Sequence, residues 1–157
     1  MAKGADHAPT VRNRKAWHDY HVEETVEAGL MLAGTEVKSV RAGKVTLTGG
    51  FVVIEDGEAW LVEVYIAPYE QGSMFNVDPR RRRKLLLNRR EIDKLDTKVQ
   101  AKGWTLVPLA VYFKHGYAKL EVGLCRGKRE YDKRDALRDR ESQREAERAM
   151  SSRRYDD

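Results

Sequence analysis

The chain has 157 residues, of which 41% are hydrophobic and 35% charged, and its formal net charge is +5 at pH 7; this length suits a single domain with one core. It contains neither an apolar run long enough to span a bilayer nor the apolar segment of a signal peptide, so we expect a cytoplasmic protein with no membrane partner. A pI near 9.3 indicates a polyanionic partner, and aromatic residues placed among the basic ones favour nucleic acid.

The first predicted elements are a polar lead-in, a long strand and a short helix. Residues 1–12 are small, polar and without hydrophobic period, so we expect a disordered lead-in. Residues 18–32 form one predicted extended segment, in which Gly29 indicates a bend or a bulge. Residues 34–44 favour a short helix, because Thr35 can cap its start and Gly43 can stop its end.

Two hairpins are predicted further along the chain. Asp56-Gly57 lies between two apolar runs, which is a strong signal for a tight turn, and His115-Gly116 separates the second pair of strands. Pro108 lies inside one of these strands, where it implies a bulge or an edge position because proline lacks the backbone donor. The predicted strands are 51–55 with 59–66, and 104–114 with 117–125.

Residues 79–95, between the hairpins, form a strongly basic window. They contain eight Arg or Lys and two Asp or Glu residues, so the window carries 8 − 2 = +6. Adjacent arginines repel one another without a counter-charge, and phosphate is an acceptor that fits guanidinium groups well. A solvated basic loop is the alternative. The candidate phosphate contacts at the start of the window are Arg80, Arg81, Arg82, Arg83 and Lys84.

The second half of this window predicts a helix. Asn88 and Glu91 have the spacing of a capping box. Ile92, Leu95 and Val99 recur at i, i+3 and i+7, which gives the helix a core face, and a glycine shortly afterwards can end it. The basic run is therefore expected to sit next to a well-defined element, which would hold its charge in a fixed place.

Together these elements predict a mainly β fold with short helices. An antiparallel β-barrel of the oligonucleotide-binding kind, with helices at its ends, is one solution, and a β-sandwich is another. Residues 13–125 contain all of these elements and form the predicted folded domain.

Residues 126–157 form a charged C-terminal tail. The tail has eleven basic and nine acidic residues and almost nothing to bury, so we expect it not to fold onto the core. Its Arg, Glu and Ala content favours helix, and a solvated, salt-bridged helix is one interpretation. The other is a segment that is disordered alone and becomes helical along RNA. If helical, it places five residues within an arc of about 80°: Lys133, Leu137, Arg140, Arg144 and Arg148.

Several motifs resemble, in the same order, those of the bacterial small protein B family, the SsrA-binding proteins. The resemblance covers nearly everything from about residue 13 to the end. The motifs that carry it are NRKAWHDY (13–20), EAG (27–29), GTEVKSVRAGK (34–44), YIAPYEQGS (65–73), RKLLLNRREIDKL (83–95), LVPLAVYFK (106–114) and GKREYDKR (127–134).

The resemblance implies an oligonucleotide-binding-like barrel that holds the tRNA-like part of transfer-messenger RNA (tmRNA). Glu27, Leu86 and Lys119 match positions that the family uses for this contact, and we add Lys38 of the short helix and the basic run 80–84. A lysine neutralises phosphate, a carboxylate accepts from base amino or ribose hydroxyl groups, and an exposed leucine packs on an unstacked base.

The resemblance also implies a role for the tail on the ribosome. In this family the tail enters the decoding region of the small subunit and the empty mRNA channel, and elongation factor Tu takes part through the aminoacylated tmRNA. The tail would be disordered alone and helical on the ribosome. The implied ribosome-contacting residues are Gly127, Lys128, Tyr131, Asp132, Lys133, Arg134, Arg140, Arg144 and Arg148.

Residues suited to catalysis or metal binding form no convincing set. Cys125 is the only cysteine, which excludes an internal disulfide and indicates a buried thiol rather than a zinc site. His18 and His21, with Asp19 or Glu23 as orienting acid, suggest a nuclease, but on a strand the two rings would face opposite sides. We therefore expect no catalytic residue, metal or cofactor.

Two other functions stay open at this point. A ribosomal or ribosome-assembly protein with the same barrel would grip ribosomal RNA constitutively, and it would sediment with ribosomes whether or not they have stalled. An RNA nuclease or modifying enzyme is a more distant alternative, and it would turn RNA over in the presence of the purified protein.

Overall fold

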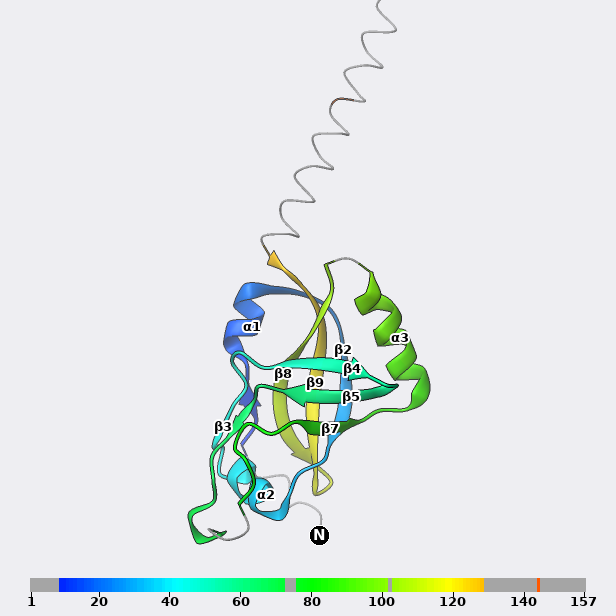
Figure 1. Cartoon of the computed structure of the whole chain (residues 1–157). Helices are drawn as coiled ribbons and strands as arrows, with labels where there is room; N and C mark the ends of the chain where they lie inside the picture. Colours follow the sequence, from blue (N-terminus) through cyan, green and yellow to red (C-terminus); the bar gives the residue numbers. More distant parts are fainter. Residues whose placement is uncertain (1–8, 73–75, 102, 129–143, 145–157) are drawn as a thin grey trace, which may run out of the picture.

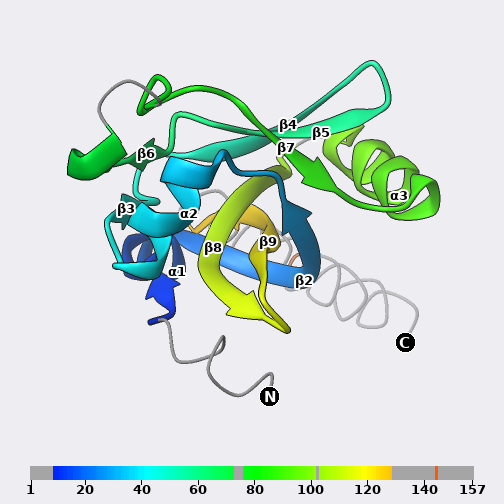
Figure 2. The ribbon, with the colours of Figure 1, turned by 90° about the horizontal axis from the view of Figure 1, so that it is seen from below.

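The computed structural model describes residues 9–72, 76–101, 103–128 and 144, and its main feature is a closed antiparallel β-barrel. Seven strands lie in the order β1-β8-β4-β5-β7-β2-β9, and pairing of β8 with β9 closes the ring, which Figure 2 shows from below. The prediction of a β-barrel with short helices is confirmed, and the sandwich is excluded. The seven strands are β1 (Val11–Arg12), β2 (Tyr20–Leu30), β4 (Phe51–Glu55), β5 (Glu58–Val62), β7 (Arg83–Leu86), β8 (Thr105–Lys114) and β9 (Tyr117–Gly127).

The remaining elements lie around this barrel. Among the described residues, a separate two-stranded sheet and three α-helices surround it, and Figure 1 shows α2 below the strands and α3 along their right-hand side. They are α1 (Arg14–Asp19), α2 (Gly34–Arg41), α3 (Arg89–Gln100), β3 (Val45–Thr46) paired with β6 (Tyr65–Ile66), and the 3-10 turn η2 (Glu70–Gly72).

Both predicted hairpins are present. Asp56 and Gly57 have φ values of 52° and 76°, and His115 and Gly116 have φ values of 52° and 80°. Two successive residues with positive φ make a turn whose twist matches that of the strands it joins. The predicted irregularity at Pro108 is also confirmed, because the β8–β9 register shifts between Pro108 and Ala110.

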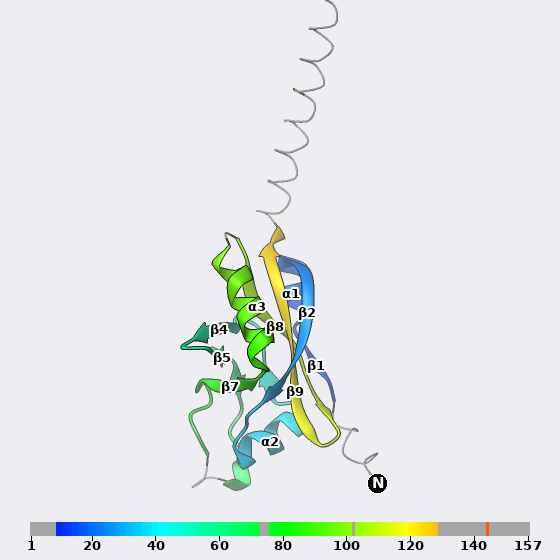
Figure 3. The ribbon, with the colours of Figure 1, turned by 90° about the vertical axis from the view of Figure 1, so that its right-hand side faces the viewer.

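The barrel interior is filled by alternate residues of the strands, because successive side chains of a strand point to opposite faces. Leu120, Val122 and Leu124 of β9 are almost completely buried in it. Val40 of α2 and Leu95 of α3 belong to the same cluster, so both helices pack against the barrel core. Figure 3 shows α3 running beside the strands and α2 at the lower end of the barrel.

Helix α1 covers a second, smaller cluster. Ala16 of α1 packs with Leu109 of β8 and Cys125 of β9. These two side chains lie on the faces of β8 and β9 that point away from the main core, and α1 covers them there. Burial raises the pKa of the Cys125 thiol to about 12, so the thiol stays protonated, as expected for a buried cysteine. This double coverage explains why β8 is buried along most of its length.

Three predictions about the N-terminal half are wrong. The segment 18–32 is not a single strand: α1 extends to Asp19, and β2 begins only at Tyr20. A bulge at Gly29 is not present: the register of β2 with β9 shifts between Val22 and Glu24 instead. Helix α2 is not capped by Thr35. Its N-cap is Ala33, whose backbone N–H donates to the Glu36 carboxylate at 3.0 Å.

Two element boundaries in the middle of the chain also differ from those predicted. The strand 59–66 is interrupted because Glu63 has a φ of 61°, and its last residues pair with β3 instead. Helix α3 ends at Gln100, before the glycine expected to stop it.

The folded region extends slightly beyond 13–125 at both ends. Val11 and Arg12 form β1 and pair with β8, so the end of the predicted disordered lead-in belongs to the sheet. At the other end, β9 continues through Arg126 to Gly127, which pairs with Tyr20. The predicted tail therefore contributes its first two residues to the barrel.

Candidate nucleic-acid interface

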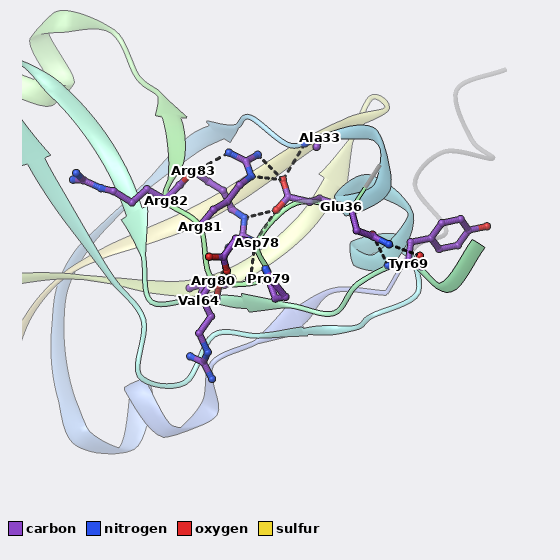
Figure 4. Close-up of polar contacts among 11 residues, drawn as sticks. Ala33, Glu36, Val64, Tyr69, Asp78, Pro79, Arg80, Arg81, Arg82 and Arg83 are labelled. Atoms are coloured by element: carbon purple, nitrogen blue, oxygen red, sulfur yellow. Dashed lines mark hydrogen bonds and ion pairs between the residues drawn. The ribbon is translucent and has the colours of Figure 1, made fainter. Parts of the chain in front are cut away.

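The basic run divides between two faces of the structure. Arg81 and Arg83 both turn toward the carboxylate of Glu36 on α2, whereas Arg82 points away from it, as Figure 4 shows. This division follows from strand alternation around β7, where successive side chains face opposite sides. A run that looks uniform in the sequence therefore supplies both an internal ion cluster and an outward-facing set of cations.

The internal cluster is closely bonded. Arg83 is fully buried, and its Nε donates to Glu36 Oε2 at 2.7 Å. Its Nη1 and Nη2 donate to the carbonyls of Val64 and Pro79 at 2.7 and 2.9 Å, and Arg81 Nε donates to Glu36 Oε1 at 3.1 Å. The guanidinium of Arg83 is thus satisfied by protein acceptors.

Burial and pairing act in opposite directions on these charges. Burial alone would raise the pKa of Glu36, but hydrogen bonds from Arg81, Ala33 and Arg83 outweigh it and leave that pKa below its ordinary value of 4.5. Burial lowers the pKa of Arg83, and Glu36 opposes this effect. The sequence suggested phosphate as the counter-charge of the basic run. For Arg81 and Arg83, the counter-charge is instead the carboxylate of Glu36. The expectation that Arg83 contacts RNA is wrong, because the fully buried side chain cannot reach a ligand on the surface.

The other members of the run lie at the surface beside aromatic rings. The Arg82 guanidinium lies 5.3 Å from the centre of the Trp60 ring, and Arg80 lies 5.5 Å from that of Tyr65. Lys38 on α2 is exposed, with its ammonium 5.1 Å from the centre of the Tyr69 ring. Such cation and ring pairs are suited to stacking on bases.

Arg82 and Lys84 also have acidic neighbours. Arg82 is 2.9 Å from Glu55, and Lys84 is 3.2 Å from Glu58. Because all four side chains are well exposed, these pairs contribute little to stability and can exchange for other partners.

Strand pairing places Leu86 and Lys119 on either side of Gly29. Gly29 of β2 lies opposite Leu86 of β7 on one side and opposite Lys119 of β9 on the other. Residues directly opposite in a ladder share a face, so Leu86 and Lys119 flank the same point on the outside of the barrel. Leu86 is 54% exposed, so its apolar side chain is open to a ligand. A Cβ on Gly29 would lie only 3.0 Å from the Leu86 Cβ, so the glycine allows Leu86 to lean across β2.

Glu27 lies two residues before Gly29 and therefore on the same face. Its Oε2 accepts a hydrogen bond from the Tyr112 hydroxyl at 2.5 Å and lies 3.7 Å from Lys114 Nζ. The hydrogen bond from Tyr112, assisted by Lys114 and Lys119, holds the pKa of Glu27 below its ordinary value. Burial and this same hydrogen bond raise the pKa of Tyr112, so the tyrosine stays protonated and acts as the donor.

These residues form one continuous surface, which we call the outer band. Trp60 pairs with Lys84, the next outward residue of β7 is Leu86, and Gly29 joins Leu86 to Lys119. The outer band runs over β5, β7, β2 and β9 and consists of Trp60, Lys84, Leu86, Gly29, Lys119 and Glu27. It combines cations for phosphate, apolar and aromatic surfaces for an unstacked base, and a carboxylate acceptor.

Sequence reasoning missed Trp60, Tyr112 and Met31. Met31 is 50% exposed, and its backbone N–H donates to the Lys84 carbonyl at 3.0 Å, which places it beside the outer band. The bulge at Pro108 shifts the alternation of β8 by one residue and so hides which face Tyr112 occupies. Trp60 alternates regularly with buried Ala59 and Leu61, and this pattern was a signal that could have identified it as outward-facing.

The described part of the predicted tail is short. Gly127 ends β9, and Lys128 follows it beside His18 and Asp19 in a shallow depression. Arg144 is described and exposed. The other predicted ribosome contacts lie outside the described residues: Tyr131, Asp132, Lys133, Arg134, Arg140 and Arg148.

The described residues contain no group of three or more His, Cys, Asp or Glu side chains arranged to hold a metal ion. His18 lies on α1 and His21 on β2, and each has a different acidic neighbour, Asp19 at 3.0 Å and Glu23 at 3.5 Å. Among the helices in this part of the chain, none has the length and apolar character needed to cross a membrane.

Comparison with known proteins identifies close relatives along almost the whole chain. The family model described as SmpB protein matches residues 10–152. SsrA-binding proteins of Streptococcus pyogenes serotype M3 (strain ATCC BAA-595 / MGAS315) and serotype M1 are each 54% identical over 150 residues, which is 96% of this chain and 96% of theirs. A chain of the solved structure described as "tmRNA-SmpB: a journey to the center of the bacterial ribosome" has 61% sequence identity and a TM-score of 0.67. The match covers 77% of this chain and 85% of that chain.

Proposed function

This chain belongs to the SmpB family, and from that premise we propose that it binds the tRNA-like domain of tmRNA, also called SsrA RNA, and acts with it on stalled ribosomes. The protein is a binding factor of the cytoplasm and makes or breaks no covalent bond itself. Relatives that are named for binding SsrA, and a similar chain solved in a tmRNA and ribosome context, support this function.

The observation that carries the proposal is the juxtaposition of Leu86, Gly29 and Lys119 on the outside of the barrel. An exposed leucine and a lysine separated by one glycine offer an apolar surface for a base next to a cation for its phosphate. Glu27, two residues away on the same strand, adds an acceptor for base amino or ribose hydroxyl groups. Single-stranded loops of folded RNA present these groups together.

Arg80, Arg82, Lys84 and Lys38 extend the same proposed RNA-binding surface. All four lie at the surface next to aromatic rings or exposed acidic groups. They contribute electrostatic attraction that does not depend on the RNA sequence. Specificity is then assigned to Glu27, Leu86 and Lys119, and Arg83 has a structural role instead.

The tail supplies the second half of the proposed function. Its basic residues enter the small-subunit decoding region and the empty mRNA channel of a ribosome stalled without a codon, and the segment becomes helical along ribosomal RNA. Elongation factor Tu delivers the aminoacylated tmRNA together with this protein. The residues assigned to this step are Gly127, Lys128, Tyr131, Asp132, Lys133, Arg134, Arg140, Arg144 and Arg148.

Separation of the two roles tests the proposal. A chain that ends at residue 129 keeps the barrel and should bind tmRNA as tightly as the full chain. In reconstituted translation of a message without a stop codon, the shortened chain should fail to support addition of the tmRNA-encoded tag. Loss of tmRNA binding on truncation would contradict this division. Stable sedimentation with ribosomes that have not stalled would favour a constitutive ribosomal RNA-binding protein instead.

A further inference from the structure

Glu27 is held by residues from a strand that is not its direct neighbour. It lies on β2, whereas Tyr112 and Lys114 lie on β8, and β9 runs between these two strands. Neighbouring strands are about 4.8 Å apart, so roughly 10 Å separates the two backbones. The Tyr112 ring crosses β9, where Lys119 is its direct partner, and its hydroxyl reaches Glu27 Oε2 at 2.5 Å.

Tyr112 and Lys114 both contact the same oxygen of the Glu27 carboxylate, Oε2. Tyr112 Oη and Lys114 Nζ each approach Oε2, at 2.5 and 3.7 Å. Within the described part of the chain, no hydrogen bond or ion pair engages the second oxygen, Oε1. The Glu27 side chain keeps 37% of its surface exposed, so this second oxygen belongs to a carboxylate that is accessible to a ligand.

We propose that Tyr112 is a positioning residue of the RNA-binding surface: its hydroxyl fixes the Glu27 carboxylate so that Oε1 is presented to base amino or ribose hydroxyl groups of the bound RNA. This inference rests on the proposed function and goes beyond it by adding a residue that acts through Glu27. An exposed glutamate otherwise loses side-chain entropy when it binds, and a carboxylate that is already held loses less.

The structural relation between Tyr112 and Lys119 adds to this role. Because the ring of Tyr112 lies across β9 beside Lys119, it limits the directions that this lysine can take. The tyrosine therefore lies between the acceptor and the cation of the site. Its hydroxyl acts on Glu27 alone, and removal of that one atom separates this effect from packing of the ring.

A double-mutant cycle tests the proposal with the full-length chain and a transcript of the tRNA-like domain of tmRNA as the probe. Glu27→Gln should weaken binding about tenfold and Tyr112→Phe about fivefold, in the range expected for a hydrogen bond that involves a charged group. The double variant should bind no more weakly than Glu27→Gln alone, because the Tyr112 hydroxyl acts only through Glu27 and phenylalanine keeps the ring. Tyr117→Phe is the matched control, since Tyr117 is 72% exposed, and its affinity should equal that of the parent.

A second variant and a second readout keep the test independent of folding. Glu27→Asp retains the charge but shortens the side chain, so the carboxylate no longer meets the hydroxyl, and it should bind as weakly as Glu27→Gln. In a carboxyl NMR titration of the protein without RNA, Tyr112→Phe should raise the pKa of Glu27, which a role limited to packing would not do.

The possible outcomes separate this inference from the proposed function. Losses that multiply in the double variant, or an unchanged affinity of Tyr112→Phe, would overturn the role of Tyr112 while leaving tmRNA binding intact. An unchanged affinity of Glu27→Gln would overturn it as well, because Glu27 would then not touch the RNA. Absence of tmRNA binding by the parent chain would contradict the proposed function itself.

Discussion

Arg83 of β7 and Glu36 of α2 form a buried ion pair, with Arg83 Nε 2.7 Å from Glu36 Oε2. The two residues are 47 positions apart in the sequence, so their pair joins α2 to β7. It also fixes the alternation of the basic run, because an inward Arg83 turns Arg82 and Lys84 outward. The internal cluster thus holds β7 in the position from which Leu86 reaches across Gly29.

The first prediction concerns this pair and stability. Glu36→Gln should lower the free energy of unfolding by about 3–5 kcal/mol, because it leaves a buried guanidinium without its counter-charge. Denaturant unfolding measures this loss. Arg82→Met removes an exposed pair with Glu55 and is the control, with an expected loss of about 1 kcal/mol at most. Equal losses of unfolding free energy in the two variants would show that the buried pair of Arg83 and Glu36 stabilises the fold no more than an exposed pair does.

The second prediction is a dependence of stability on pH that Glu36 creates. Its pKa in the folded chain lies below the ordinary value of 4.5, so the stabilisation is complete above that pH and is lost as the pH falls toward the folded-state pKa. Unfolding free energies measured from neutral pH down to about pH 3 should therefore fall less steeply in Glu36→Gln. Glu55→Gln, which removes an exposed carboxylate, should keep the parent profile. The same slope in the parent and Glu36→Gln would refute this assignment.

The sequence predicts the local elements of this fold well where the signal is short-range. The Asp56-Gly57 and His115-Gly116 turns and the Asn88 cap of α3 are decided by residues within a few positions of each other. The structure confirms all three. Helix α1 was missed because only Ala16 of its six residues is buried, so no hydrophobic period marks it.

The site is predicted only in part, for a related reason. The resemblance to a family supplied Glu27, Leu86 and Lys119, and strand pairing brings all three together on one face. The resemblance did not supply the residues that contact these side chains only in the folded chain. Glu36 neutralises Arg83 from 47 residues away, and Tyr112 reaches Glu27 from 85 residues away. Neither distance leaves a periodic signal in the sequence.

The third prediction separates the roles of Lys119 and Leu86 in the outer band. Lys119→Ala should weaken tmRNA binding and reduce the slope of log affinity against log salt by about 1, as expected for one lost phosphate contact. Leu86→Ala should weaken binding about fivefold and leave the salt slope unchanged, because it removes apolar contact only. Affinity titrations at several salt concentrations give both values. Lys94→Ala, on the exposed side of α3, is the control and should change neither. A smaller salt slope for Leu86→Ala would contradict the role assigned to it.

The fourth prediction concerns Gly29. An alanine Cβ would lie 3.0 Å from Leu86 Cβ and 3.3 Å from its Cδ1, so Gly29→Ala should displace Leu86 from its position across β2. Because Gly29 is not among the glycines with positive φ, the backbone accepts alanine and the loss of stability should be small. Affinity for tmRNA should fall about as far as in Leu86→Ala. Gly34→Ala is the matched control, since no atom lies within 4 Å of its Cβ. Parent-like binding by Gly29→Ala would show that the position of Leu86 does not matter.

The central claim is that the outer band recognises tmRNA rather than any polyanion. Competition binding with the purified full-length protein tests it most directly, with tmRNA, bulk tRNA and a ribosomal RNA fragment compared at physiological and at raised salt. Non-specific attraction would hold all three RNAs comparably and would fade for all of them together as salt rises. We expect a preference for tmRNA that persists at raised salt and is reduced in Lys119→Ala. Equal binding of the three RNAs at both salt concentrations would contradict the account.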